Sequence, residues 1–212
     1  LKRFLPHLSL HADVGSKNPV ADILKIYGIT FDDFSVNVET SPLAGIVSDG
    51  HVYSLSKDGT MLDTAFFRIT QDSTQLDYNV GLRCHQQPTV PAFKANLEGF
   101  LMADQAEARL TYFDKRGRKG IDLGVMAHAS DTCITYKLFP EKPVIAFKEF
   151  ELNEDNYVVM YPKRPIRADV RLASPADSCS ISLYADENEF KRQVANVVVN
   201  NLNLKQLLTV VP

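Results

Sequence analysis

The sequence predicts an all-β fold: an elongated, strongly curved, mostly antiparallel sheet with one or two short helices. The main observation is that apolar and polar residues alternate one for one along much of the chain. Because successive side chains of a strand point to opposite faces, such alternation gives the sheet one apolar and one polar face. The pattern recurs in segments 76–83, 119–127, 132–139, 166–172 and 179–185. Most connections are short, which favours antiparallel pairing of neighbours.

Length and composition are those of an ordinary globular protein. The 212 residues are 45% hydrophobic and 23% charged, enough for one large all-β domain or two small ones. The formal net charge of −3 argues against a strongly cationic nucleic-acid-binding protein. The chain begins Leu1-Lys2-Arg3-Phe4, without a Met. We therefore expect residues 1–212 to be a single β-groove segment of a longer protein.

The first half of the chain contains the one clear helix signal. Asn18 is a good N-cap, Pro19 suits the first helical position, and Gly28 supplies a stop. The pairs Asp49-Gly50 and Asp58-Gly59 are predicted turns between apolar stretches. The helix is preceded by an alternating run at residues 4–14 and followed by predicted strands at 31–39, 61–70 and 74–83.

The second half continues with alternating segments up to a final strand at Val197-Val198-Val199. Residues 114–120 form a basic turn. Pro140 and Pro143 are expected to end the strand that begins near residue 132, because proline cannot donate to a strand ladder. Residues 202–208 are expected to be a strand end running into a helical turn.

Few residues suggest chemistry. His7 and His11 have a spacing that could hold zinc on a helix, but in a strand they would lie about 13 Å apart. Ser54-Leu55-Ser56-Lys57 has the residue pattern Ser-x-x-Lys of serine acyl-transfer enzymes. In those enzymes the motif lies on a helix, whereas here it runs into the predicted turn at Asp58-Gly59. Three cysteines, at 84, 133 and 179, are too sparse for a disulfide framework. We expect no enzyme activity, no catalytic residues, no metal and no cofactor.

The candidate functional surface is therefore the apolar face of the alternating strands. It comprises Leu76, Tyr78, Val80, Leu82, Leu110, Tyr112, Ile121, Leu123, Val125, Ile134, Tyr136, Leu138, Ile166, Val170, Leu172, Ile181 and Leu183. Two interpretations remain open. The face could close into the core of a β-sandwich, acting as a structural, adhesin or carbohydrate-binding module. Alternatively, it could stay partly open as a groove for lipid chains.

The last third of the chain carries a more specific pattern. It reads Phe147–Met160, then Ile166–Leu172, Cys179–Tyr184 and Asn196–Leu208, ending in a strand of the type Asn-Leu-x-Leu-x-x-Leu-Leu. These segments resemble the TamB-like family of the AsmA superfamily, the translocation and assembly module, in its Bacteroides-type version. Asn156-Tyr157 stands where that family often has a Trp, and this chain has none.

The resemblance implies a non-catalytic periplasmic protein of a Gram-negative bacterium, anchored in the inner membrane, with a taco-shaped apolar groove. It implies a role in outer-membrane protein assembly, in phospholipid transport between membranes, or in both. The implied partners are phospholipid acyl chains or nascent outer-membrane strands, together with an Omp85-type outer-membrane barrel. No nucleic acid is expected among the partners.

Overall fold

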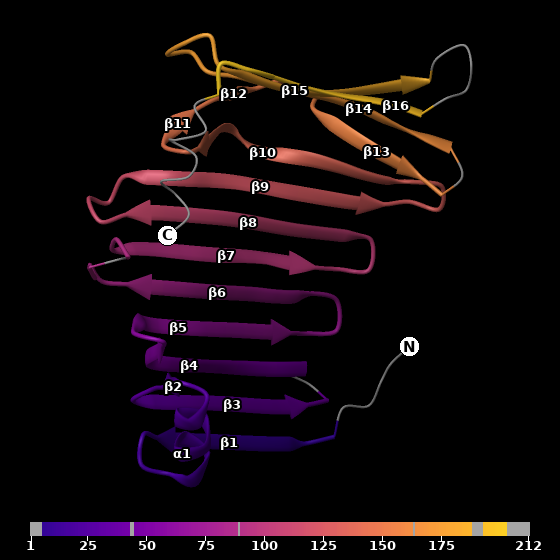
Figure 1. Cartoon of the computed structure of the whole chain (residues 1–212). Coiled ribbons are helices and arrows are strands. Elements are labelled where there is room, and N and C mark those ends of the chain that lie inside the picture. The colour runs from indigo at the N-terminus through magenta and orange to yellow at the C-terminus, as the bar shows by residue number, and fades with distance from the viewer. Residues whose placement is uncertain (1–5, 43–44, 89, 163, 188–192, 203–212) are drawn as a thin grey trace. The chain divides into compact units, whose positions relative to one another are not determined.

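The computed structural model describes residues 6–42, 45–88, 90–162, 164–187 and 193–202, which form sixteen strands and one α-helix. Figure 1 shows the strands in chain order. Every strand pair with a defined register is antiparallel. The prediction of an all-β, mostly antiparallel fold with a short helix is confirmed. The chain divides into two compact units: unit 1 is Leu1–Ala103 with Phe113–Gly117, and unit 2 is Asp104–Tyr112 with Arg118–Pro212.

Unit 1 holds one helix and the first seven strands. They are β1 (Leu8–Gly15), α1 (Pro19–Ile26), β2 (Ile29–Thr30), β3 (Asp33–Ser41), β4 (Gly45–Lys57), β5 (Thr60–Gln71), β6 (Leu76–Cys84) and β7 (Phe93–Leu101). The strand order is β1-β3-β4-β5-β6-β7, with β2 paired to the end of β4. Among the described residues no pairing joins β1 to β7, so the sheet of unit 1 is open.

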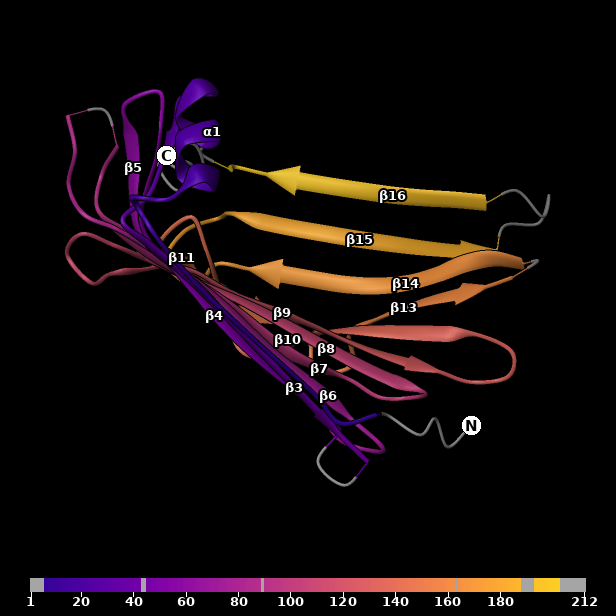
Figure 2. The ribbon, with the colours of Figure 1, turned by 90° about the horizontal axis from the view of Figure 1, so that it is seen from below.

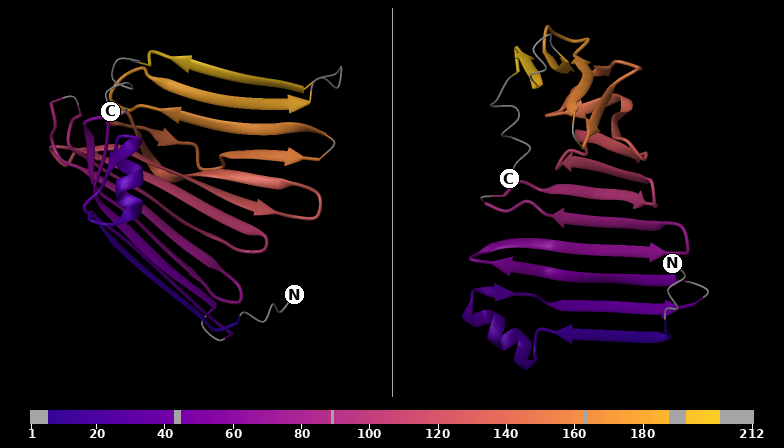
Figure 3. Two further views of the ribbon diagram at one scale, coloured as in Figure 1. Left: turned by 60° about the horizontal axis from the view of Figure 1, so that its bottom comes forward. Right: turned by 90° about the vertical axis from the view of Figure 1, so that its right-hand side faces the viewer.

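The helix forms where the sequence predicts it. Asn18 Oδ1 accepts hydrogen bonds from the backbone N–H groups of Val20 (2.8 Å) and Ala21 (3.0 Å). These bonds satisfy donors that the first turn of a helix cannot pair internally. Pro19 lies at the first helical position, and Gly28 follows the helix with φ of 72°. α1 lies next to β2 at one end of the strands of unit 1 (Figure 3).

The predicted turn at Asp49-Gly50 is wrong, whereas that at Asp58-Gly59 is confirmed. Gly50 lies in the middle of β4, opposite Val36 on one side and Phe67 on the other. A Cβ atom built on Gly50 would lie 2.5 Å from Phe67 Cε1. The glycine therefore makes room for an aromatic ring on a neighbouring strand, and is not needed for a turn.

The register places alternate rows of side chains on opposite faces of unit 1. One row is Ala12–Val36–Gly50–Phe67–Val80–Leu97. The adjacent row is His11–Asn37–Asp49–Arg68–Asn79–Glu98. Directly opposite residues share a face of an antiparallel pair. We call the face with the first row the apolar face of unit 1 and the face with the second row its polar face.

Unit 2 continues the antiparallel pattern. Its strands are β8 (Gln105–Asp114, of which Phe113 and Asp114 fall in unit 1), β9 (Lys119–Ala129), β10 (Ile134–Ile145), β11 (Lys148–Glu149), β12 (Glu151–Leu152), β13 (Tyr157–Tyr161), β14 (Arg164–Ala173), β15 (Ser180–Glu187) and β16 (Gln193–Asn200). The order is β8-β9-β10-β13-β14-β15-β16, with β11 on β10 and β12 on β14. Figure 2 shows β13–β16 side by side.

Pro140 and Pro143 do not end their strand, which corrects the prediction made from the sequence. β10 runs through both prolines to Ile145. Its pairing with β9 shifts register after Phe139 and resumes where Val144 lies opposite Asp122. Proline is tolerated at such an irregularity because no ladder hydrogen bond is required there.

A small closed core lies in unit 2. Phe150, Leu172 and Cys179 are buried, and Phe150 is 0% exposed. The half-buried side chains packed against them are Ile145, Leu152, Ile181 and Leu202. The predicted final strand, Val197-Val198-Val199, lies within β16. Residues 203–208, where the sequence predicts a helical turn, lie outside the described residues.

Candidate functional site

The apolar face of unit 1 holds the first group of predicted site residues. Leu76, Tyr78, Val80 and Leu82 alternate along β6 and share this face. Val80 lies between Phe67 of β5 and Leu97 of β7. Figure 1 shows β6 between these two strands. The strand alternation thus gathers apolar side chains from six strands onto one surface.

This face is largely exposed. Leu10 is 53% exposed, Phe34 38%, Val80 39% and Leu97 40%. Side chains of this kind in a closed sandwich core are normally buried. Within the described part of unit 1, no second layer of strands covers the face. A continuous apolar surface of this extent typically marks a binding site for a protein, membrane or ligand.

The remaining predicted residues lie in unit 2, and they differ in burial. Val125 lies opposite Leu138, Val170 opposite Leu183, and Leu172 opposite Ile181. Half-buried or exposed members are Leu110, Ile121, Leu123, Val125, Ile134, Tyr136, Leu138, Ile166, Ile181 and Leu183. Val170 and Leu172 are buried, as is Tyr112, whose ring meets the ring of Phe147 edge-on at 6.3 Å. These three contribute to packing, and the others present apolar surface.

The polar face of unit 1 contains contacts that the sequence does not reveal. His51 Nε2 lies 3.1 Å from a carboxylate oxygen of Asp33 on this face. His85, just after the end of β6, contacts Asp63 of β5, a residue that the alternation of β5 assigns to the face of Phe67. The partners are 18 and 22 residues apart in the sequence. Only the strand register brings them together, so local motif spacing carries no signal for these pairs.

His11 has two side-chain partners on this face. Its ring hydrogen-bonds Asn37 and contacts the Asp13 carboxylate at 2.5 Å. The bond to Asn37, followed by that to Asp13, raises the pKa of His11 above its ordinary value. The pKa of Asp13 is lowered, chiefly by a hydrogen bond from Ser35. In the described part of the chain, no three His, Cys, Asp or Glu residues gather as a metal site.

Asp122 of β9 forms ion pairs with Arg109 of β8 and Lys119 of β9. Its side chain is 3% exposed and lies 2.7 Å from Arg109 Nε and 2.5 Å from Lys119 Nζ. Arg109 also donates from Nη2 at 3.0 Å, making the pair bidentate. The hydrogen bond from Arg109 lowers the pKa of Asp122 most strongly, even though burial opposes it. The arrangement is a structural ion pair joining two strands.

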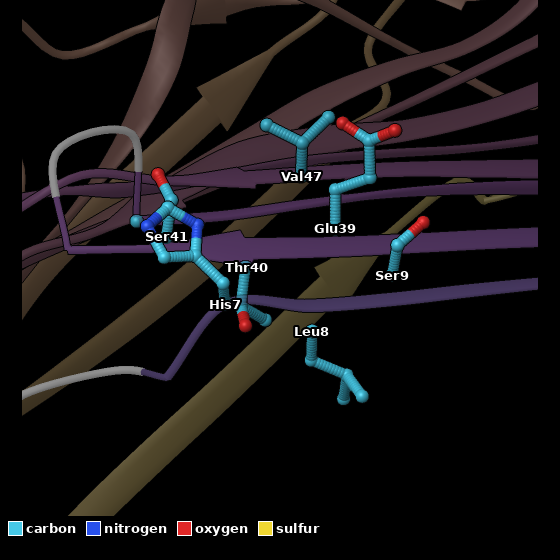
Figure 4. A pocket seen from close by; sticks show the side chains of 8 residues that line it. His7, Leu8, Ser9, Glu39, Thr40, Ser41 and Val47 are labelled. Atoms are coloured by element: carbon cyan, nitrogen blue, oxygen red, sulfur yellow. The ribbon is translucent and has the colours of Figure 1, made fainter.

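A hollow of about 370 Å³ lies at one corner of unit 1. Figure 4 shows Ser9, Glu39 and Val47 along it, with Leu8 and Thr40 beside them. Leu8 and Thr40 share the apolar face, and Ser9, Glu39 and Val47 share the polar face. The hollow therefore wraps around the strand edge and is a corner of the surface rather than an enclosed pocket.

Comparisons with known proteins add no identification. No family model, curated protein or solved structure matches this chain. The helix in the described part of the chain is too short to cross a membrane. The function must therefore be argued from the exposed apolar face itself.

Proposed function

We propose that this chain is a non-catalytic, periplasmic β-sheet segment of a TamB-like protein, and that its apolar face binds phospholipid acyl chains. In this role it supports phospholipid transport between the membranes, outer-membrane protein assembly beside an Omp85-type barrel, or both. The full-length protein would be anchored in the inner membrane of a Gram-negative bacterium.

One observation carries the proposal. The row Ala12–Val36–Gly50–Phe67–Val80–Leu97 crosses six neighbouring strands without a charged residue. Several apolar side chains on the same face, including Leu8, Leu82 and Leu101, are 36–54% exposed. Leaving such a surface in water is unfavourable by roughly 25 cal/mol for each Å² of apolar area. A bound apolar ligand would remove that cost.

Acyl chains suit the chemistry of this face. A CH₂ group gains about 0.8 kcal/mol when it is buried against apolar surface, and it needs no hydrogen-bond partner. The face offers apolar side chains without a converging set of polar groups, so it would favour long chains without selecting one headgroup. A nascent outer-membrane strand is the alternative cargo, because its alternating side chains could also lay an apolar side on this face.

Paired crosslinkers on opposite faces test the proposal in cells. A photo-reactive phenylalanine analogue at Leu82 or Leu97 would lie on the apolar face, and one at Arg83 or Glu98 on the polar face. The members of each pair differ by one residue, so they share depth, strand and local mobility. We expect phospholipid to be captured at Leu82 and Leu97 and not at Arg83 or Glu98, as measured by mass spectrometry.

The outcomes separate the alternatives. Lipid capture that is equal on both faces, or absent from both, contradicts the proposal. Capture of an outer-membrane polypeptide at Leu82 and Leu97, without lipid, would replace acyl chains by nascent strands as the cargo. The full-length double variant Leu82→Glu with Leu97→Glu should weaken outer-membrane integrity in a strain that depends on this protein, whereas Arg83→Glu with Glu98→Gln should not.

A further inference from the structure

A second hollow, of about 540 Å³, lies within unit 2 on β13, β14, β15 and β16. It is lined by Tyr157, Asp169, Arg171, Ser182, Tyr184 and Val198, together with Ala168 and Ala185. Asp169 and Arg171 point away from the face that carries Val170 and Leu183, because they alternate with Val170 along β14. The charged and aromatic lining residues therefore lie on the other face of these strands from Val170 and Leu183, and no lining residue belongs to unit 1. Its volume falls within the usual range for small-molecule sites, about 300–1,000 Å³.

The register places a carboxylate between two aromatic rings. Tyr157 of β13 lies opposite Asp169 of β14, and Asp169 lies opposite Tyr184 of β15. The next residue in this row is Asn196 of β16. Neighbouring strands are about 4.8 Å apart, so the two tyrosines are separated by about 10 Å with the carboxylate between them. Tyr184 is 50% exposed, which leaves its ring open to a ligand.

An ion pair supplies donors and acceptors in the lining of the hollow. Arg171 donates from Nε to Asp169 Oδ1 at 2.8 Å and from Nη2 to Asp169 Oδ2 at 2.9 Å. These bonds use two of the five N–H groups of the guanidinium. The Arg171 side chain is 69% exposed and that of Asp169 30%. Both side chains therefore present surface to a ligand, that of Arg171 more than that of Asp169.

Asn153 holds this part of β14 in place. Its Oδ1 accepts from the Arg171 backbone N–H at 2.8 Å, and its Nδ2 donates to the Asp169 backbone carbonyl at 3.2 Å. Both bonds are to the main chain, so they position the two strand residues without engaging their side chains, which pair with each other. A site held in its binding geometry loses less entropy when a ligand arrives.

We propose that this hollow, defined by Tyr157, Asp169, Arg171, Ser182 and Tyr184, binds a pyranose sugar of an oligosaccharide. A sugar ring has apolar C–H faces that can pack on aromatic rings and hydroxyl groups that both donate and accept. Tyr157 and Tyr184 offer the rings, Asp169 accepts, Arg171 donates, and Ser182 does both.

The charge balance favours a neutral ligand. The carboxylate of Asp169 would repel an anion, and the guanidinium of Arg171 would repel a cation, so neither charge is selected. A neutral polyol can instead bond to both groups without separating them. The inference does not depend on lipid binding, because none of the residues that line the hollow belongs to the apolar face of unit 1.

Titration with defined oligosaccharides tests the inference. The probes are maltohexaose, cellohexaose, laminarihexaose and chitohexaose, added up to about 10 mM to the full chain and followed by calorimetry. Because the chain has eight tyrosines and no tryptophan, tyrosine fluorescence gives a second readout. We expect at least one of these sugars to bind. Tyr184→Ala and Arg171→Gln should each weaken that binding about tenfold, whereas Tyr184→Phe should retain most of it.

Tyr53→Ala is the matched control, since Tyr53 is 44% exposed on β4 in unit 1 and is not among the residues that line the hollow. It should leave sugar binding unchanged, and circular dichroism should show that every variant remains folded. The inference is overturned if none of the four sugars binds, or if Tyr53→Ala weakens binding as much as Tyr184→Ala. Binding of phosphoethanolamine instead of sugar, lost in Asp169→Asn, would also overturn it and identify a zwitterion site.

Discussion

The ring of Phe66 in β5 lies over the backbone of Gly81 in β6. The two residues are directly opposite each other, and a Cβ atom on Gly81 would lie 2.2 Å from Phe66 Cε1. Phe139 covers Gly124 in the same way in unit 2. In a sheet with little buried core, an aromatic ring lying on a glycine shields backbone hydrogen bonds and adds contact area. Such pairs stabilise strands that no second layer covers.

Gly81→Ala should therefore destabilise the protein by about 1–3 kcal/mol, because the methyl group displaces the Phe66 ring. Urea denaturation followed by circular dichroism measures the change. Gly15→Ala, where nothing lies within 4 Å of the added Cβ, is the matched control and should change stability little. In the double variant Gly81→Ala with Phe66→Leu, the glycine substitution should cost less than it does alone. Equal effects of Gly81→Ala and Gly15→Ala would contradict this packing argument.

Acid should remove the contribution of Asp122 to stability. Its pKa in the folded protein lies below its ordinary value because Arg109 hydrogen-bonds the carboxylate. A carboxyl group with a lowered folded pKa stabilises the fold above its unfolded pKa, about 3.9, and this stabilisation is lost as the pH falls through the folded pKa. At neutral pH Asp122→Asn should cost about 1–3 kcal/mol, because the guanidinium and ammonium groups lose their charged partner.

The pH dependence provides the check for Asp122. Denaturation midpoints of the native protein and of Asp122→Asn should differ most near pH 7 and converge below about pH 4. Asp177→Asn is a useful comparison, since Asp177 also has a lowered pKa but is an exposed partner of Lys148. It should have a smaller effect at every pH. A constant difference between native protein and Asp122→Asn across the whole range would refute the linkage.

The three cysteines should react at different rates. Cys133 is half-buried, and its pKa is lowered chiefly by its hydrogen bond with Ser130, at 3.4 Å between Oγ and Sγ. Cys84 is buried, and burial raises its pKa. Because the thiolate is the reactive form, iodoacetamide at neutral pH should modify Cys133 about tenfold faster than Cys84 or Cys179. Peptide mass spectrometry over time measures the rates.

Two controls accompany the cysteine experiment. Ser130→Ala should slow modification of Cys133, because the thiolate loses a hydrogen-bond donor. In urea all three cysteines should react at similar rates. Preferential labelling of Cys84 in the folded protein would show that its burial is not maintained in solution.

Asn18→Ala should weaken α1 by about 1 kcal/mol, since Val20 and Ala21 lose the acceptor for their backbone N–H groups. Hydrogen exchange of the amides in α1 should rise, while exchange in β5 and β6 should not change. Asn18→Asp, which keeps an acceptor at the cap, should preserve protection. An unchanged exchange rate in Asn18→Ala would show that packing rather than capping holds the helix.

Local patterns determined much of this fold. Strand and helix positions follow from short-range rules: side chains alternate along a strand, and Asn18 and Pro19 supply the groups that begin a helix. Alternation along β6 also determines that Leu76, Tyr78, Val80 and Leu82 share one face of the strand. The same rules failed at Gly50 and Pro140, because a nearby ring and a register shift, both tertiary features, decide what those residues do.

Only the tertiary structure decided which side chains meet. The pairing of His51 with Asp33 and the alignment of Tyr157, Asp169 and Tyr184 depend on strand register, which no single segment encodes. The sequence by itself determined that an apolar face exists. How far that face is covered depends on what packs against it: Val80 remains 39% exposed in unit 1, whereas Leu172, in an equally alternating strand, is buried against Phe150 and Cys179.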